Sequence, residues 1–360
     1  MKKIKILYTI PNFDTAGSGK VVYDLVKGLD PSRFEVHIAC FHDRGAFFKE
    51  VEALGRPIHI VKTITNYYPY VTLFSRIWSI SRFFRRQKFD LVHSWQWSND
   101  WTEAVAAKLS GSRWIYTKKA MGYGSRHWRI KSYLADFIIT INDEMRQYFP
   151  NKKAQGLIPL GLDTDFYSPI HFQHIPSDGF RVITVANLVP VKGIEILIKA
   201  IKLLDDPNTS LSIVGRHTDA YGDELKQLVV DLGMEQQVVF HGPQLDVRPF
   251  FANADLYVIP TLDQGRKEGM PMALVEAMSL GIPVLGSDIS GINFVLKDFK
   301  HLLFGAGNAL ELSKKIRDIR SLPSQERLAM GDSLRAYCLT NFTLQGFVSA
   351  HETLYRKLLQ

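Results

Sequence analysis

Short apolar runs alternate with amphipathic stretches along almost the whole length of this 360-residue chain. The runs are rich in branched and aromatic side chains, which is typical of buried strands, and the stretches between them repeat their apolar residues with a helical period. This alternation predicts parallel sheets covered by helices. In the first half we expect strands at residues 4–10, 35–41, 57–62, 90–95, 113–117 and 136–142, and helices at 20–28, 71–86 and 102–109.

A stretch rich in Pro, Gly and Asp, residues 156–179, interrupts this pattern and predicts a domain boundary. We therefore expect an α/β protein with two Rossmann-like, doubly wound domains, 1–160 and 161–340. Their ligand cleft should lie between them, because such sheets bind at the carboxyl ends of their strands. The expected strands of the second domain are 180–187, 211–215, 237–242, 255–260 and 282–287, and helices follow at 194–204, 325–337 and 347–359.

Composition places the chain among globular proteins, with 46% apolar and 22% charged residues. The two cysteines, Cys40 and Cys338, lie far apart and provide neither a disulfide framework nor a metal-binding spacing, which fits a reducing cytoplasm. The apolar start of the chain is interrupted by Lys5 and stopped by Pro11, so it predicts a strand rather than a signal peptide. Since no apolar run approaches the ~18 residues of a membrane span, we expect a soluble protein.

Positive charge is concentrated in the first half of the chain. Residues 1–160 carry a net charge of +12 and residues 161–360 a net charge of −4, which gives +8 in total. This asymmetry suggests that the first half meets an anionic partner, for which nucleic acid and anionic lipid are both candidates.

The stretch "TAGSGKVVYDLV", residues 15–26, contains two glycines and a lysine, as phosphate-binding loops do. It matches neither the P-loop nor the dinucleotide-binding pattern. A P-loop would need a glycine at Asp14 and a Ser or Thr at Val21, and a dinucleotide fingerprint would need its third glycine at Val22. What remains is a glycine-containing loop that leads into a helix. Its N-terminal amides can attract an anion, although a plain tight turn explains the glycines equally well.

The most specific stretch is "EGMPMALVEAMSLGIPVLGSD", residues 268–288. It resembles the E-x7-E signature of retaining glycosyltransferases of the GT-B fold, family 4, with Glu268 and Glu276 as its two acids. Pro271 suits a first helical turn, which leaves Glu268 in the preceding loop and the amides of Gly269 and Met270 open to a sugar hydroxyl or diphosphate. Glu276 falls on the helix, where its carboxylate can accept two hydrogen bonds from a ribose diol. The alternative is two ordinary helix-surface glutamates.

A second stretch, "VANLVPVKGIEIL", residues 185–197, is similar to the family's Gly-Arg-Leu, three residues, then Lys-Gly. In the family the arginine and the lysine clamp the donor diphosphate. Lys192 and Gly193 match, but Asn187 stands at the arginine position, and a neutral amide cannot replace a bidentate guanidinium. We therefore expect diphosphate binding to depend on Lys192 and on helix-terminal amides, with one hydrogen bond from Asn187.

The opening loop resembles the family's Gly-Gly-Ala-Glu-Arg-Val-Val, with Ala16 and Gly17 on the two glycines and Gly19 in place of the glutamate. The resemblance implies that this loop faces the donor's phosphate and sugar and needs no magnesium. Arg216, in "VGRHTD", fits the family's nucleotide-side loop as a phosphate contact, and it fits an exposed surface position equally well.

Many relatives carry a histidine near the transferring sugar, after the strand that matches 113–117. Lys118 and Lys119 occupy these positions here, so Lys119 is expected to contact the donor or an anionic acceptor. His93 and His127 are candidates to substitute for the histidine, although each also fits a purely structural role.

The stretch 70–90 combines apolar and basic residues with a helical period. Leu73, Ile77, Ile80 and Phe84 form one stripe that predicts core packing. Trp78 and Phe83 lie off this stripe among arginines, as in helices that rest on anionic membranes. An amphipathic core helix with a solvated basic face is the alternative.

The resemblance as a whole implies a retaining, metal-independent hexosyltransferase without a cofactor. Its second domain would bind a nucleotide-sugar, UDP-sugar being favoured, and its first domain a saccharide or lipid-linked acceptor in cell-surface polysaccharide or glycoconjugate synthesis. The terminal helix, 341–360, would cross back to pack on the first domain. The only acidic D-x-D pattern, 163–165, lies in the linker, so no metal site is expected. We expect a cytoplasmic protein, peripheral at the membrane through 70–90.

Three other functions remain open at this point. A nucleotide-sugar epimerase of related fold would use the same donor without an acceptor. A non-catalytic nucleotide or sugar binder is compatible with Asn187 and Lys119, which both depart from the family pattern. A nucleic-acid binder would explain the basic first half but lacks a recognisable reading module, which makes it the least favoured.

Overall fold

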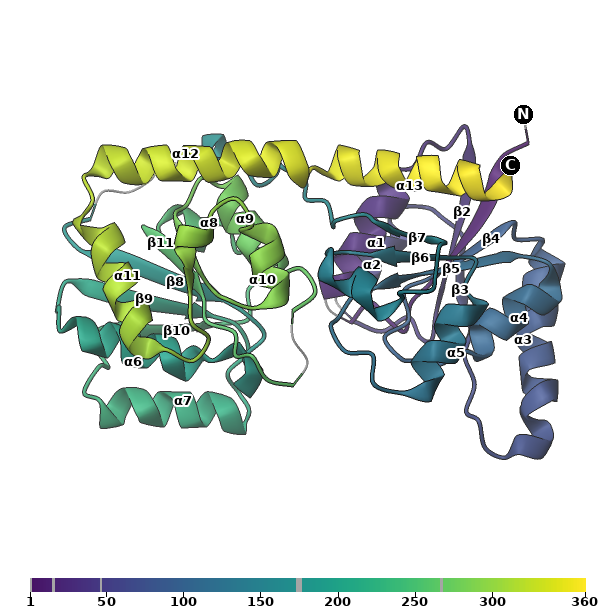
Figure 1. Cartoon of the computed structure of the whole chain (residues 1–360), viewed down its shortest axis with the longest axis horizontal. Coiled ribbons are helices and arrows are strands. Elements are labelled where there is room, and N and C mark those ends of the chain that lie inside the picture. The colour runs from purple at the N-terminus through teal and green to yellow at the C-terminus, as the bar shows by residue number, and fades with distance from the viewer. Residues whose placement is uncertain (1, 15–16, 46, 173–176, 266–267) are drawn as a thin grey trace. The chain divides into compact units, whose positions relative to one another are not determined.

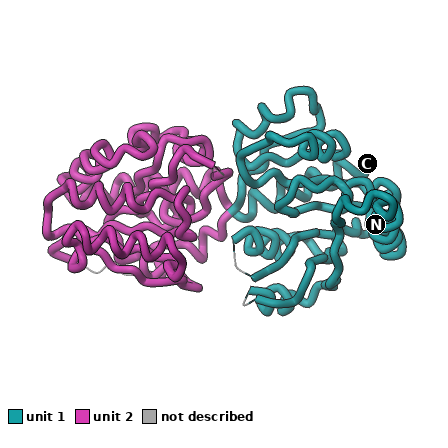
Figure 2. Tube along the Cα trace, turned by 90° about the horizontal axis from the view of Figure 1, so that it is seen from below, with its two compact units in different colours: residues 1–161, 344–360 teal, residues 162–343 magenta. Residues whose placement is uncertain are grey.

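The computed structural model of the chain describes residues 2–14, 17–45, 47–172, 177–265 and 268–360 (Figure 1). The chain divides into two compact units, which we call unit 1 (residues 1–161 and 344–360) and unit 2 (residues 162–343) (Figure 2). Each unit contains one parallel sheet covered by helices. The expected fold class, two Rossmann-like α/β domains, is thus confirmed.

The sheet of unit 1 has the strand order β3-β2-β1-β4-β5-β6-β7. The order reverses between β1 and β4, and such a switch point opens a ligand crevice at the carboxyl ends of the strands. The strands are β1 (Ile4–Thr9), β2 (Phe34–Cys40), β3 (Ile58–Ile60), β4 (Leu91–Ser94), β5 (Arg113–Lys118), β6 (Phe137–Thr140) and β7 (Gln155–Leu157). The helices are α1 (Gly17–Gly28), α2 (Phe48–Glu52), α3 (Leu73–Gln87), α4 (Thr102–Ser110), α5 (Arg126–Leu134) and α13 (Leu344–Leu359).

The last helix, α13, is built into the core of unit 1 and packs against α1 (Figure 1). The Tyr355 hydroxyl lies 2.8 Å from the Tyr8 hydroxyl on β1 and 2.7 Å from Nδ1 of His93 on β4. All three side chains are fully buried. These hydrogen bonds satisfy polar groups that would be costly to bury alone, so they fix α13 against the two central strands.

The sheet of unit 2 has the order β10-β9-β8-β11-β12-β13 and reverses between β8 and β11. Its strands are β8 (Phe180–Val185), β9 (Thr209–Val214), β10 (Val238–Gly242), β11 (Leu256–Ile259), β12 (Val284–Ser287) and β13 (Leu303–Phe304). Its helices are α6 (Ile194–Leu204), α7 (Ala220–Asp231), α8 (Arg248–Ala252), α9 (Met272–Ser279), α10 (Ser290–Val295), α11 (Ala309–Ser321) and α12 (Ser324–Asn341).

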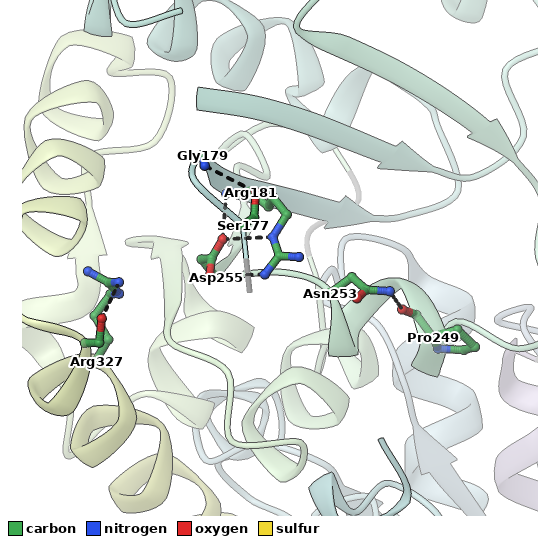
Figure 3. A network of polar contacts seen from close by, with 8 residues as sticks. Ser177, Gly179, Arg181, Pro249, Asn253, Asp255 and Arg327 are labelled. Atoms are coloured by element: carbon green, nitrogen blue, oxygen red, sulfur yellow. Dashed lines mark hydrogen bonds and ion pairs between the residues drawn. The ribbon is translucent and has the colours of Figure 1, made fainter. Parts of the chain in front are cut away.

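An ion pair joins the two central strands of unit 2 at their amino ends (Figure 3). Arg181 on β8 donates from its backbone N–H to Oδ2 of Asp255 at 2.8 Å and from Nε to the same oxygen at 3.1 Å. Both side chains are largely buried. These charge-assisted hydrogen bonds hold β8 and β11 together at their amino ends.

The helix after β1 differs from the sequence expectation. It begins at Gly17 rather than Lys20, so Gly17 and Gly19 lie in its first turn and not in a loop. Ala16 lies outside the described residues. Phe83 lies off the apolar stripe of α3, as predicted, but it does not belong to the exposed side of the helix. Its ring is partly buried and packs at 5.2 Å from His59, measured between ring centres.

We expect Tyr355→Phe to lower the free energy of unfolding of unit 1 by about 1–3 kcal/mol, because Tyr8 and His93 both lose a buried hydrogen-bond partner. Every tryptophan of the chain lies in unit 1, so tryptophan fluorescence during urea denaturation reports on this unit alone. Tyr133→Phe, at a ring that is 83% exposed, is the matched control and should be neutral. Equal stability of the two variants would show that the Tyr355 hydroxyl does not hold α13 in place.

Candidate functional site

The loops after β8 and β11 meet at the carboxyl edge of unit 2, where the strand order reverses. The N–H of Leu262 donates to the carbonyl of Val191 at 2.8 Å and joins the two loops directly. Ligands of open α/β sheets bind outside the strand ends at such a switch point. This edge is therefore the candidate site of unit 2.

Lys192, from the first loop, and Glu268, from the second, form an ion pair through Nζ and Oε1. The two side chains are only 20% and 19% exposed. Burial lowers the pKa of Lys192 to about 8. The structure thus brings together the two residues that the sequence placed on the donor diphosphate and the donor sugar.

The local sequence explains why Lys192 points to this place. A short 3₁₀ turn, Pro190–Lys192, ends at Gly193, whose φ of 62° lies in the left-handed region. A Cβ on Gly193 would lie 2.3 Å from the carbonyl oxygen of Pro260, at the end of β11. Only glycine fits both the conformation and this close approach, and α6 starts directly after it.

The loop that carries Glu268 is held from the other side by α10. A Cβ on Gly291 would lie 2.4 Å from the Glu268 carbonyl oxygen, so the first turn of α10 packs directly on this loop. Gly269, Met270 and Pro271 are buried, and Pro271 is the N-cap of α9. Gly269 and Met270 each have an interaction partner within the structure.

Glu276 lies on α9, as predicted, and is half-buried. Burial raises the pKa of Tyr167, and the negative charge of the nearby Glu276 carboxylate raises this pKa further. The Tyr167 carbonyl accepts in turn from Ser279 Oγ at 2.7 Å and from Arg335 at 3.3 Å. Sequence reasoning missed Tyr167, because it treated the segment around 163–165 as linker, and its only signal was an aromatic residue in that segment.

Asn187 and Arg216 follow β8 and β9 at the same carboxyl edge, and both side chains are exposed. Among the described residues, no group of three or more His, Cys, Asp or Glu side chains is arranged to hold a metal ion. Lys192 and Arg216 give this edge two positively charged side chains.

The remaining predicted site residues belong to unit 1, close to its own switch point. Trp97, in the loop after β4, donates from Nε1 to the Ser18 hydroxyl at 3.0 Å and so joins that loop to the first turn of α1 next to Gly17. Gly19 faces inward, since a Cβ there would lie 3.0 Å from the buried Phe13 ring. This orientation argues against a direct ligand contact for Gly19.

The structure does not place His93 where a substrate could reach it. The ring is fully buried, with Nδ1 at 2.7 Å from the Tyr355 hydroxyl and Nε2 at 2.8 Å from Thr117 Oγ1. Burial holds its pKa well below the usual value. His93 is therefore a neutral structural histidine, and its assignment as a catalytic candidate is corrected.

Lys118 is the last residue of β5, and Lys119 directly follows it. Lys118 is buried, with Nζ 4.1 Å from the centre of the Trp128 ring. Lys119 is half-buried at the carboxyl edge of unit 1, where its Nζ donates to the carbonyl of Trp95 and lies 5.8 Å from the Trp97 ring centre. The other histidine candidate, His127, accepts a hydrogen bond from Trp101 Nε1 at 3.1 Å and stacks on Tyr67.

Two family models divide the chain between them. The model described as glycosyltransferase family 4 matches residues 15–166, and the model described as glycosyl transferases group 1 matches residues 169–335. Among solved structures, the chain is similar to a glycosyltransferase from Rickettsia africae, with a TM-score of 0.88, 16% identity and full coverage of both chains. It is also similar to HepE from Anabaena in complex with UDP, with a TM-score of 0.82, 20% identity and coverage of 98% and 100%.

Among curated proteins, the amylovoran biosynthesis glycosyltransferase AmsK of Erwinia amylovora is 35% identical over 121 residues, which is 31% of this chain and 28% of AmsK. The alignments to this and two further curated relatives span 28% to 52% of those proteins' lengths. The solved structures support the fold, and the two models together account for both units. The chain belongs to the group 1, or family 4, glycosyltransferases.

Proposed function

We propose that the protein transfers a sugar from a nucleotide-sugar, with retention of configuration, to a saccharide or lipid-linked acceptor in cell-surface polysaccharide or glycoconjugate synthesis. The observation that carries the proposal is the Lys192–Glu268 pair at the switch point of unit 2. A cation and a carboxylate side by side suit a diphosphate joined to a sugar. HepE, of similar fold, is a complex with UDP, and this supports a UDP-sugar as donor.

Lys192 is the group best suited to the donor diphosphate. Burial has already removed part of its hydration and lowered its pKa to about 8, so a phosphate oxygen would stabilise the ammonium form strongly. Asn187 adds a neutral donor, and Arg216 adds an exposed guanidinium that can reach toward the same anion. Since these groups supply positive charge to the leaving diphosphate, we propose that the reaction needs no metal ion.

Glu268 is the group best suited to the donor sugar. When Lys192 turns to the diphosphate, the Glu268 carboxylate loses its cation and can accept hydrogen bonds from sugar hydroxyls. The bond from sugar C1 to the diphosphate oxygen then breaks through an oxocarbenium-like state. The acceptor hydroxyl bonds to C1 on the same face, and its proton passes to the leaving phosphate oxygen. Preorganised positive charge at that oxygen lowers the barrier.

Glu276 acts further from the bond that breaks. Its carboxylate lies near Tyr167, on the helix behind the Glu268 loop, a position suited to the ribose diol. We therefore assign it to nucleotide binding rather than to the transfer step.

A non-catalytic nucleotide binder is the second candidate, and Asn187 in place of the family's arginine is the observation that favours it. Incubation of the protein with candidate nucleotide-sugars, with and without an acceptor preparation, separates the functions. Transfer should release nucleoside diphosphate only when acceptor is present. Conversion of the sugar without acceptor would indicate an epimerase, and binding without turnover would indicate a binder.

We expect Glu268→Gln to lower kcat by more than about 100-fold while UDP binds as tightly as before or more tightly, because the amide no longer competes for Lys192. We expect Glu276→Ala to weaken UDP binding by about 10-fold, with a smaller effect on kcat. Steady-state kinetics and calorimetric titration with UDP measure the two effects. Glu235→Gln, at an exposed position of unit 2, is the control. Equal and small effects of both changes would contradict the assignment.

The affinity for UDP should fall by up to about 10-fold between pH 7 and pH 9, as Lys192 loses its proton in the free protein. The sign follows because phosphate binding favours the ammonium form, while the terminal phosphate, with a pKa of about 6, is already ionised over this range. Lys192→Arg should remove the pH dependence, and Lys192→Ala should weaken binding by about 10- to 100-fold at pH 7. A pH profile that is unchanged in Lys192→Ala would assign the titration to another group.

A further inference from the structure

The turn before α3 and the first turns of this helix expose a group of large apolar side chains. Tyr68, Tyr70, Val71 and Phe74 are 70%, 61%, 92% and 65% exposed. Three of them belong to two pairs of contacting rings, since the Tyr68 and Tyr70 ring centres are 4.4 Å apart and those of Phe74 and Trp78 are 6.2 Å apart. Figure 1 shows this turn at an end of unit 1, past the neighbouring helices.

The opposite side of α3 anchors it firmly. Ile77, Ile80 and Phe84 are buried in the core of unit 1 against the sheet and α4. Arg76 also turns inward, where its guanidinium donates to Thr65 Oγ1 at 3.1 Å and to the Asn66 carbonyl at 2.8 Å. The exposed aromatic residues therefore stand on a fixed helix and a braced turn.

Basic residues continue the exposed side toward the end of α3. Arg82, Arg85 and Arg86 are exposed, and the Arg85 guanidinium lies 5.2 Å from the centre of the Trp78 ring. No Asp or Glu occurs in the sequence between Glu52 and Asp90. We call this surface the α3 face, and it consists of Tyr68, Tyr70, Val71, Phe74, Trp78, Arg82, Arg85 and Arg86.

We propose that the α3 face binds the surface of a bilayer that contains anionic phospholipid. Exposed tyrosine and phenylalanine side chains, with the half-buried Trp78 beside them, suit the boundary between headgroups and acyl chains, and a row of arginines without acids suits anionic headgroups. A surface that binds another protein would be expected to carry charges of both signs. Nucleic acid would gain nothing from the exposed apolar end of the α3 face. No helix in the described ranges is long and apolar enough to span a bilayer, so contact through this face is superficial.

The aromatic end of the α3 face lies on the same side of unit 1 as the carboxyl edge of its sheet. The chain leaves β3 at the carboxyl edge of the sheet, and α3 runs back toward the amino edge, so the aromatic end of the face lies on the carboxyl side. Tyr67 ties the turn to that edge, with its ring centre 4.7 Å from His127 and 5.3 Å from Trp101. If the proposed transfer function holds, a lipid-linked acceptor would be presented next to the edge that carries Trp97 and Lys119. The membrane contact itself does not rest on that function.

Vesicle co-sedimentation of the whole chain tests the proposal. We expect binding to vesicles of phosphatidylcholine with 30% phosphatidylglycerol to exceed binding to phosphatidylcholine alone by at least about 10-fold at low salt, and to weaken as salt rises. Val71→Ser with Phe74→Ser, and separately Arg82→Glu with Arg86→Glu, should each reduce the partition coefficient by about 10-fold or more. All four positions are exposed, so the variants should fold, and tryptophan fluorescence checks this.

Matched changes on unit 2 serve as controls. Leu245→Ser with Leu328→Ser removes exposed apolar side chains, and Lys199→Glu with Lys314→Glu reverses exposed charges, without touching the α3 face. Both control variants should bind anionic vesicles through the α3 face as the unchanged protein does, apart from the small effect of the altered net charge. Equal binding to neutral and anionic vesicles, or equal loss in control and α3 variants, would overturn the proposal. So would a change in oligomeric state of the α3 variants without any vesicle binding, since a second copy would then cover the face.

Discussion

The ion pair between Lys192 and Glu268 is the interaction on which the account of unit 2 depends. Two opposite charges, each about four-fifths buried, are stable only as partners, because either one alone would carry the full cost of lost hydration. The pair therefore holds the loops after β8 and β11 together, and Gly193 and Gly291 allow the backbones to approach closely enough for it to form. In the proposed function, a donor that carries both a phosphate and hydroxyl groups takes over these contacts, with the phosphate on Lys192 and the hydroxyl groups on Glu268.

Much of this edge could be predicted from the sequence. The apolar runs placed the central strands within a few residues, and residues directly after a parallel strand must lie at its carboxyl edge. Lys192 and Gly193 follow β8, and Glu268 follows β11, so their meeting at one switch point is a consequence of topology. The position of Glu276 on a helix also followed from Pro271 and from the apolar residues around it.

Partners that are distant in sequence could not be predicted in this way. His93 looked available at the end of a strand, but Tyr355, 262 residues away, occupies one ring nitrogen, and Thr117 occupies the other. Tyr167 comes close to Glu276 from a segment that had no periodic pattern. Phe83 lies off the main apolar stripe of α3, yet it packs on His59 from a neighbouring strand. Hydrophobic periods describe one element at a time, whereas these contacts depend on which elements become neighbours.

The change in melting temperature of the chain with UDP, GDP, ADP or CMP, with and without EDTA, tests the central claim most directly. Calorimetry is the suitable method, because unit 2 contains no tryptophan. A ligand at about 100 times its dissociation constant adds about 2.7 kcal/mol, which corresponds to several degrees for a domain of this size. We expect one nucleoside diphosphate to raise the transition of unit 2, unaffected by EDTA, and Lys192→Ala to reduce this rise to about half or less at the same ligand concentration. No change in melting temperature with any of the four nucleotides, or an equal rise in Lys192→Ala, would contradict a nucleotide site at Lys192.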